Sequence, residues 1–203
     1  MSDSTFLSLV TTRRSIRRYR PDPVPLELVH ALLAAATFAP SAHNRQPWRF
    51  VVLQTTATRH RLAAAMGAKL RADLQADGIT PERIEQDVGR SYQRLTNAPV
   101  LILVCLTMQD MDSYPDAQRQ HHEWTMATQS VAMAGQTLLL AAHAQGLGAC
   151  WVCAPLFCPE VVQQALALPS QWQPQGLITL GYPAETKVKE RAPIESRVLW
   201  LID

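Results

Sequence analysis

The chain has 203 residues, enough for one large domain, and its 47% hydrophobic content can fill a core. Nineteen basic and 17 acidic residues give a net charge of +2, which is too balanced to favour binding of nucleic acid or a membrane surface. The N-terminus lacks a signal-peptide pattern, and no stretch approaches the roughly 18 apolar residues of a membrane span. We therefore expect a cytoplasmic protein that binds neither nucleic acid nor a membrane.

Helical periodicity dominates the chain, because apolar residues recur three or four positions apart. The clearest example follows Pro25, where Leu26, Val29 and Leu32 fall on one stripe. Glycine and proline residues interrupt the pattern and separate one helix from the next. The predicted helices span residues 4–11, 26–38, 58–75, 81–95, 122–145 and 159–168.

Short apolar runs between these helices predict a small sheet. Val100–Leu106 is continuously apolar and too short for most helices, so we predict a strand that is buried on both faces. Further strands are predicted at residues 48–54, 149–152 and 176–180. The apolar tail at residues 198–202 has no local partner, which favours pairing with a second subunit. The predicted fold class is α+β, a small sheet surrounded by helices.

An arginine cluster follows the first predicted helix. Arg13, Arg14 and Arg17 flank Ser15, and a Pro-rich turn comes next. Guanidinium groups at such a place can converge on a phosphate through bidentate hydrogen bonds, to which a serine hydroxyl adds a donor. The alternative is an ordinary solvated basic stretch.

A polar loop over residues 39–48 is the second candidate. It contains Ser41, Asn44 and Gln46 and leads into Trp48. Amide side chains carry both donors and acceptors, which suits the alternating carbonyl and N–H groups of a flavin's pyrimidine edge. The alternative is a turn in which Trp48 anchors the following strand.

Together the two segments resemble the nitroreductase superfamily. The resemblance rests on five motifs that span most of the chain. These are Arg13-Arg14-Ser15-x-Arg17, Ala39-Pro40-Ser41-x-x-Asn44-x-Gln46-Pro47-Trp48, Gly146-Leu147-Gly148-Ala149-Cys150-Trp151, Gly181-Tyr182-Pro183 and Lys189-x-Arg191.

The resemblance implies a three-layer fold with a mostly antiparallel sheet and a homodimer that holds FMN at its interface. Backbone N–H groups of Cys153 and Ala154 would face flavin N5, so no side chain is expected to be catalytic. Many relatives have glycine where this chain has Cys153-Ala154. The contact with N5 is expected to survive this difference, because backbone N–H groups make it. The implied cofactor-binding residues are Arg13, Arg14, Ser15, Arg17, Gln46, Cys153, Ala154, Lys189 and Arg191, with Ser41 and Asn44 from the partner subunit.

Within the family, residues 66–95 and 113–117 resemble the flavin-binding C-terminal domain of the two-domain deazaflavin coenzyme biosynthesis protein of actinobacteria, here as a stand-alone version. We therefore expect one domain over residues 1–203, a helical lid at 66–95 and a tail at 184–203 that is exchanged between subunits. Lys69, Arg71 and Asp73 on the lid would present charges to a substrate.

The function that the resemblance implies is an FMN-dependent oxidoreductase. It would pass hydride from NADH or NADPH through flavin N5 to a small planar acceptor in a ping-pong cycle. One alternative is a reductase that acts on a deazaflavin coenzyme or its dehydro precursor, and another is a non-catalytic flavin or deazaflavin binding protein.

No metal is expected. Cys150 and Cys153 form a C-x-x-C without the second pair that a zinc site needs. A thioredoxin-type redox dithiol is the alternative, but its first cysteine should begin a helix, and this motif lies in a predicted strand and its exit. His121 and His122 are adjacent, so on a helix their side chains would diverge by about 100°.

Overall fold

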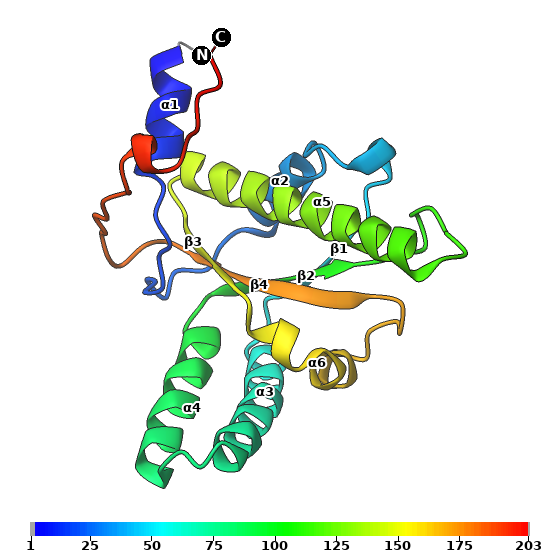
Figure 1. Ribbon diagram of the computed structural model, residues 1–203. Coiled ribbons are helices and arrows are strands. Elements are labelled where there is room, and N and C mark those ends of the chain that lie inside the picture. Colours follow the sequence, from blue (N-terminus) through cyan, green and yellow to red (C-terminus); the bar gives the residue numbers. More distant parts are fainter. Residues whose placement is uncertain (1–2, 203) are drawn as a thin grey trace.

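The fold is a four-stranded antiparallel sheet with helices on both faces (Figure 1). The computed structural model describes residues 3–202. The strands are β1 (Trp48–Leu53), β2 (Val100–Leu106), β3 (Gly148–Val152) and β4 (Gln173–Gly181), in the spatial order β1-β2-β4-β3. The helices are α1 (Asp3–Thr12), α2 (Leu26–Ala36), α3 (Thr56–Ala76), α4 (Pro81–Thr96), α5 (Ala117–Ala144) and α6 (Pro159–Leu166).

Strand β2 lies at the centre, and its side chains alternate between the two faces. Val100, Ile102 and Val104 join one apolar cluster, which α2 and α5 cover. Leu101 and Leu103 join the other, which α3 and α6 cover. Every residue of the strand is buried, which confirms the prediction of a strand with two covered faces.

Most element boundaries follow the sequence pattern, with two departures. Helix α5 begins at Ala117 rather than at His122, because the side chain of Asp116 accepts a hydrogen bond from the Arg119 N–H and caps the helix. Strand β4 begins at Gln173 rather than at Gly176. A break in register opposite Val104 and Cys105 of β2 admits one extra residue of β4 and lets the pairing continue beyond it.

The tail after β4 runs without a strand along the described chain. Leu199 and Leu201 are more than four-fifths exposed, and Trp200 is 72% exposed. Strand pairing of this tail with a second subunit remains a prediction. No helix among residues 3–202 has the length and hydropathy needed to cross a membrane.

Helix α6 ends in a strained residue. Ala167 adopts φ 51° and ψ 46°, and the Leu168 N–H closes the helix by donating to the Gln163 carbonyl at 3.0 Å. A side chain in this left-handed conformation costs roughly 1 kcal/mol, which glycine avoids. Ala167→Gly is therefore expected to raise the free energy of unfolding by about 0.5–1 kcal/mol in urea titrations. A loss of stability would mean that Ala167 does not adopt the left-handed conformation.

Candidate functional site

The arginine segment extends the sheet beyond its β3 edge. Ser15 forms a parallel bridge with Ala149 of β3, and the Ile16 N–H donates to the Ala149 carbonyl at 3.0 Å. Tyr19 forms an antiparallel bridge with Pro183, which directly follows β4. The segment is thus fixed by backbone pairing on two sides. One guanidinium nitrogen of Arg14 is occupied by the Thr11 and Arg13 carbonyls, at 2.6 and 2.8 Å.

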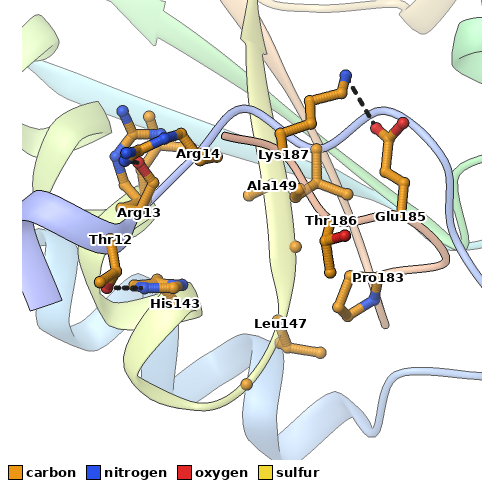
Figure 2. A pocket seen from close by; sticks show the side chains of 14 residues that line it. Thr12, Arg13, Arg14, His143, Leu147, Ala149, Pro183, Glu185, Thr186 and Lys187 are labelled. Carbon is orange, nitrogen blue, oxygen red and sulfur yellow. Dashed lines mark hydrogen bonds and ion pairs between the residues drawn. The ribbon is translucent and has the colours of Figure 1, made fainter. Parts of the chain in front are cut away.

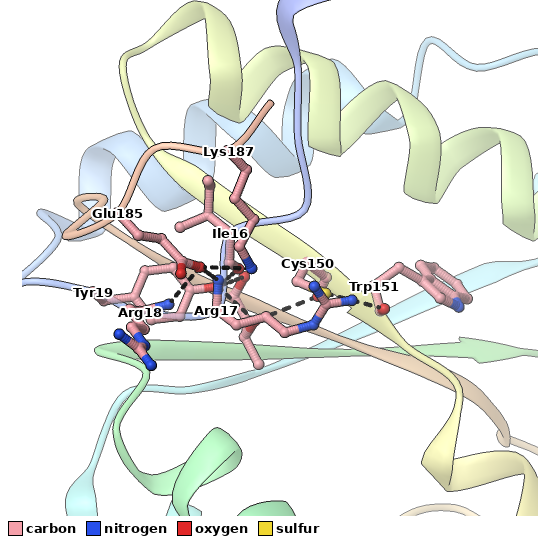
Figure 3. Close-up of polar contacts among 9 residues, drawn as sticks. Ile16, Arg17, Arg18, Tyr19, Cys150, Trp151, Glu185 and Lys187 are labelled. Atoms are coloured by element: carbon pink, nitrogen blue, oxygen red, sulfur yellow. Dashed lines mark hydrogen bonds and ion pairs between the residues drawn. The ribbon is translucent and has the colours of Figure 1, made fainter. Parts of the chain in front are cut away.

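Glu185 secures the turn of this segment (Figure 3). Its carboxylate accepts hydrogen bonds from the backbone N–H groups of Arg17 at 2.7 Å and Arg18 at 3.2 Å, and it pairs with Lys187 at 3.0 Å. These contacts lower the pKa of the Glu185 carboxyl against the opposing effect of desolvation, which is the largest influence on it. The carboxylate therefore serves the backbone and Lys187 rather than the arginine side chains.

A hollow of about 360 Å³ lies between the arginine segment and the tail. Its polar lining consists of Arg14, Ser15 and Arg17 together with Lys187, Lys189 and Arg191, and Val188 completes it. Lys189 and Arg191, predicted to bind the same cofactor as the arginine cluster, lie beside Arg14 and Arg17 in this hollow.

Three arginines in and beside this hollow carry positive charge that no carboxylate of the described chain balances: Arg14 and Arg191 line it, and Arg13 lies next to them. Burial, then the nearby Arg191 and Arg14, lower the pKa of the Arg13 guanidinium. Among residues 3–202, no carboxylate forms an ion pair with Arg13, Arg14 or Arg191. The Nε atom of Arg14 is buried and has no hydrogen-bond partner. Such a set of donors fits an anion with several oxygens, such as a phosphate.

A second hollow of about 270 Å³ adjoins the first (Figure 2). Arg13 and Arg14 line it from one side, and the end of α5 lines it with Leu139 and His143. The His143 ring is hydrogen-bonded to the Thr12 hydroxyl at 2.9 Å. The lining is therefore mixed: Arg13, Arg14, His143 and residues 185–187 supply polar groups, and Leu139, Leu147 and Ala149 supply apolar surface.

His143 gives the apoprotein a pH dependence. Burial, then Arg13 and Arg14, lower the pKa of the imidazole below 6.5, so the unfolded state binds a proton at higher pH than the folded state does. Stability should therefore fall as the pH drops from 6.5 toward the folded-state pKa. We expect His143→Asn to flatten this part of a plot of urea midpoint against pH. An equally steep plot for the variant would assign the dependence to other groups.

Cys153 and Ala154 lie at the other end of β3. Cys153 follows the strand directly, and Ala154 begins the 3-10 helix η2 (Ala154–Phe157). Cys153 lies four positions beyond Ala149, the residue beside the arginine segment, which in extended chain is a span of about 13 Å. The two predicted parts of the site are therefore joined by one strand.

The loop with Ser41, Asn44 and Gln46 lies elsewhere in the subunit. It packs on the middle of α5, where the Ala42 N–H donates to Ser130 Oγ at 3.2 Å. Ser130 precedes His143 by 13 positions on the same helix, about 20 Å along its axis. One chain alone does not bring these three residues to the arginine hollow.

This loop also has a strained backbone. His43, Asn44 and Gln46 have φ values of 50°, 55° and 52°. The Ser41 hydroxyl holds the turn by accepting from the Gln46 N–H at 3.0 Å, and Gln46 Nε2 donates to Asn44 Oδ1 at 3.2 Å. Residues in such conformations cluster at functional sites, because the surrounding structure must enforce them.

The predicted substrate residues separate into two groups. Lys69 and Asp73 of α3 form an ion pair and line a cavity of about 100 Å³ beside Ala154 and Phe157. Arg71 instead binds Glu85 of α4 through Nε at 3.0 Å and Nη2 at 2.8 Å. Arg71 thereby ties α3 to α4, and only the first pair adjoins the Cys153–Ala154 turn.

Helix α4 contributes residues that the sequence analysis did not select. Arg90, Gln93 and Arg94 line an open groove of about 590 Å³ with Arg17 and Arg18. Their spacing of three and four positions puts them on one helix face, and this pattern was visible in the sequence. Most of this helix falls within the lid predicted at 66–95, so its basic face was not predicted as part of the site.

The chain is similar in sequence to known proteins over most of its length. A model of the nitroreductase family matches residues 10–182. An NADH dehydrogenase of Thermus thermophilus is 36% identical, over 93% of this chain and 92% of that relative. A 5,6-dimethylbenzimidazole synthase of Rhodospirillum rubrum is 34% identical, over 88% of this chain and 82% of that relative.

A solved structure has the same fold. It is a nitroreductase-type protein from Desulfovibrio desulfuricans in complex with FMN. It is 28% identical and covers 97% of this chain and 96% of its own, with a TM-score of 0.74. The antiparallel sheet and its helical layers are therefore shared between the two proteins.

Proposed function

This chain belongs to the nitroreductase family, and we propose that it is an FMN-dependent NAD(P)H oxidoreductase that reduces small planar acceptors in a ping-pong cycle. The observation that carries the proposal is the cationic hollow lined by Arg14 and Arg191, with Arg13 close beside it. Among the described residues, none of these three arginines has a carboxylate partner. The names of the relatives and the FMN complex of the solved relative agree with this assignment.

The residues of the hollow fit a flavin nucleotide. Arg13, Lys189 and Arg191 would hold the phosphate, for which the buried Nε of Arg14 and the Ser15 hydroxyl offer further donors. Arg17 would meet the polar edge of the ring. Arg94 lines the groove beside Arg17 from α4 and would add positive charge there, which favours an anionic reduced cofactor, whereas Arg90 is paired with Asp87.

FMN supplies the redox chemistry when it is bound, because its N5 accepts hydride from a reduced nicotinamide and later passes it to an acceptor. The chain supplies binding and orientation. The backbone turn at Cys153 and Ala154 would direct its N–H groups to N5, and donor and acceptor would use the same open face in succession.

A second copy of the chain would complete the site. Ser41 and Asn44 lie too far along α5 to reach the arginine hollow of their own subunit, so we assign them to the hollow of the partner. The exposed apolar tail after residue 184 is a suitable contact surface for that partner, since patches of this kind mark interaction sites. Sedimentation of the apoprotein and of the FMN-loaded protein tests the dimer.

Reduction by a nicotinamide is the direct test of the activity. Protein loaded with FMN should show oxidised-flavin absorbance, and anaerobic addition of NADH or NADPH should bleach it. Oxygen or a quinone should then restore the absorbance, because the cycle has two separate halves. Flavin bands that neither nicotinamide bleaches would contradict the proposed oxidoreductase and favour a binding protein.

A deazaflavin compound is a second candidate acceptor. Lys69 lines the small cavity beside Ala154, and its amine would exchange Asp73 for the carboxylate or phosphate of such a compound. Lys69→Ala should weaken deazaflavin binding. Arg71→Ala is the matched control, since Arg71 faces Glu85 instead. Product analysis should also include 5,6-dimethylbenzimidazole, because a 34% identical relative is named 5,6-dimethylbenzimidazole synthase.

A further inference from the structure

The indole of Trp151 occupies a slot that two glycines leave open. A Cβ atom on Gly135 of α5 would lie 2.4 Å from the Trp151 ring, and so would one on Gly176 of β4. The extra residue of β4 adjoins Gly176, at the break in register with β2. A helix, a strand and a bulge therefore all make room for one ring.

The single polar atom of this ring points to Cys153. Trp151 Nε1 donates a hydrogen bond to Cys153 Sγ at 3.2 Å, whereas the rest of the ring packs against the apolar cluster under α5. In Figure 3 the indole points away from the arginine segment. A phenylalanine could also pack in this slot, so packing alone does not account for the N–H group.

Cys153 controls the turn from β3 into η2. Its backbone adopts φ −83° and ψ 0°, outside the strand conformation, and its carbonyl accepts from the Leu156 N–H at 3.0 Å. Its side chain is exposed, so the bond to Trp151 is the contact that fixes it. Ala154, the other residue of the proposed N5 contact, follows directly.

We propose that Trp151 is a positioning residue that fixes Cys153, and through it the Cys153–Ala154 turn against the flavin. The inference rests on the proposed function, because FMN is what the turn would face. The slot left by Gly135 and Gly176 would therefore serve to orient the Cys153–Ala154 turn, in addition to packing the core.

A double-mutant cycle tests the bond. Trp151→Phe retains a ring in the slot and removes the donor, and Cys153→Ala removes the acceptor at an exposed position. Each should weaken FMN binding about three- to tenfold and shift the flavin midpoint potential, because loss of the bond lowers the fraction of the apoprotein whose turn is already in the binding conformation. The double variant should show no further change. Cys153→Ser should retain most of the wild-type affinity, and Trp172→Phe, the same exchange at a ring in the other core cluster, should change neither quantity.

Amide hydrogen exchange provides a readout that does not need FMN. Exchange at Leu156 in the apoprotein should accelerate several-fold in Trp151→Phe and in Cys153→Ala, because the turn opens more often. Additive effects in the cycle, or unchanged exchange and midpoint potential in folded Trp151→Phe, would overturn the positioning role. Absence of FMN binding in the wild type would instead overturn the proposed function, and the exchange experiment would still decide the role of Trp151.

Discussion

Replacing Arg191 by alanine is expected to weaken FMN binding about 10- to 100-fold, with no loss of stability in the apoprotein. A hydrogen bond to a charged group contributes about 1.5–3 kcal/mol, and each 1.4 kcal/mol is a factor of ten in the dissociation constant. Arg13→Ala should weaken binding by a similar factor. Fluorescence titration of FMN into each variant measures the effect.

Weaker FMN binding and unchanged apoprotein stability in Arg191→Ala have one physical origin. Arg191 lowers the pKa of Arg13, which means that the two cations repel each other in the absence of a ligand. A dianionic phosphate between them would convert that repulsion into attraction. Removal of Arg191 therefore relieves the apoprotein and deprives the ligand complex of a donor. A residue with only a structural role would show the opposite combination.

Arg197→Ala is the matched control. Arg197 is an exposed arginine on the same tail, and it lines none of the hollows described above. Its replacement changes the net charge by the same amount and should leave FMN affinity within about twofold, since distant exposed charges are screened. Equal losses of FMN affinity in Arg191→Ala and Arg197→Ala would mean that only the net charge matters, and would contradict the assignment of Arg191 to the phosphate.

Local patterns predicted the fold well where one property dominated. Val100–Leu106 was predicted with its observed bounds, because an unbroken apolar run after Pro99 suits a short strand covered on both faces. The first turns of α5 were missed, since residues 117–121 are polar and carry no apolar stripe. The start of β4 was missed because Pro174 masks a strand that only the bulge makes possible.

The site was less accessible to such patterns. The arginine cluster was evident as a local feature, but its convergence with Lys189 and Arg191 depends on a chain reversal more than 160 residues later, and family resemblance supplied it. The basic face of α4 was visible in the sequence as the spacing of Arg90 and Arg94, but this segment was predicted to be part of a lid. The slot around Trp151 had no signature, because Gly135 and Gly176 meet only in the folded chain.

Two glycines within helices should respond in opposite directions to the same substitution. Gly89 of α4 has no atom within 4 Å of the position that a Cβ would occupy, whereas at Gly135 of α5 that position lies 2.4 Å from Trp151. Alanine is favoured over glycine in a helix by about 1 kcal/mol. Gly89→Ala should therefore raise the free energy of unfolding by about 0.5–1 kcal/mol.

Gly135→Ala should lower the free energy of unfolding by about 2 kcal/mol, because the cost of overpacking exceeds the helix preference. The expected difference between the two variants, close to 3 kcal/mol in urea titrations, isolates the contact with Trp151 from the backbone effect that they share. In a Trp151→Ala background the ring is gone, so Gly135→Ala should become neutral or stabilising. If Gly135→Ala stabilised the wild type as Gly89→Ala does, the ring would not occupy this slot, and the geometry that directs its N–H to Cys153 would not hold either.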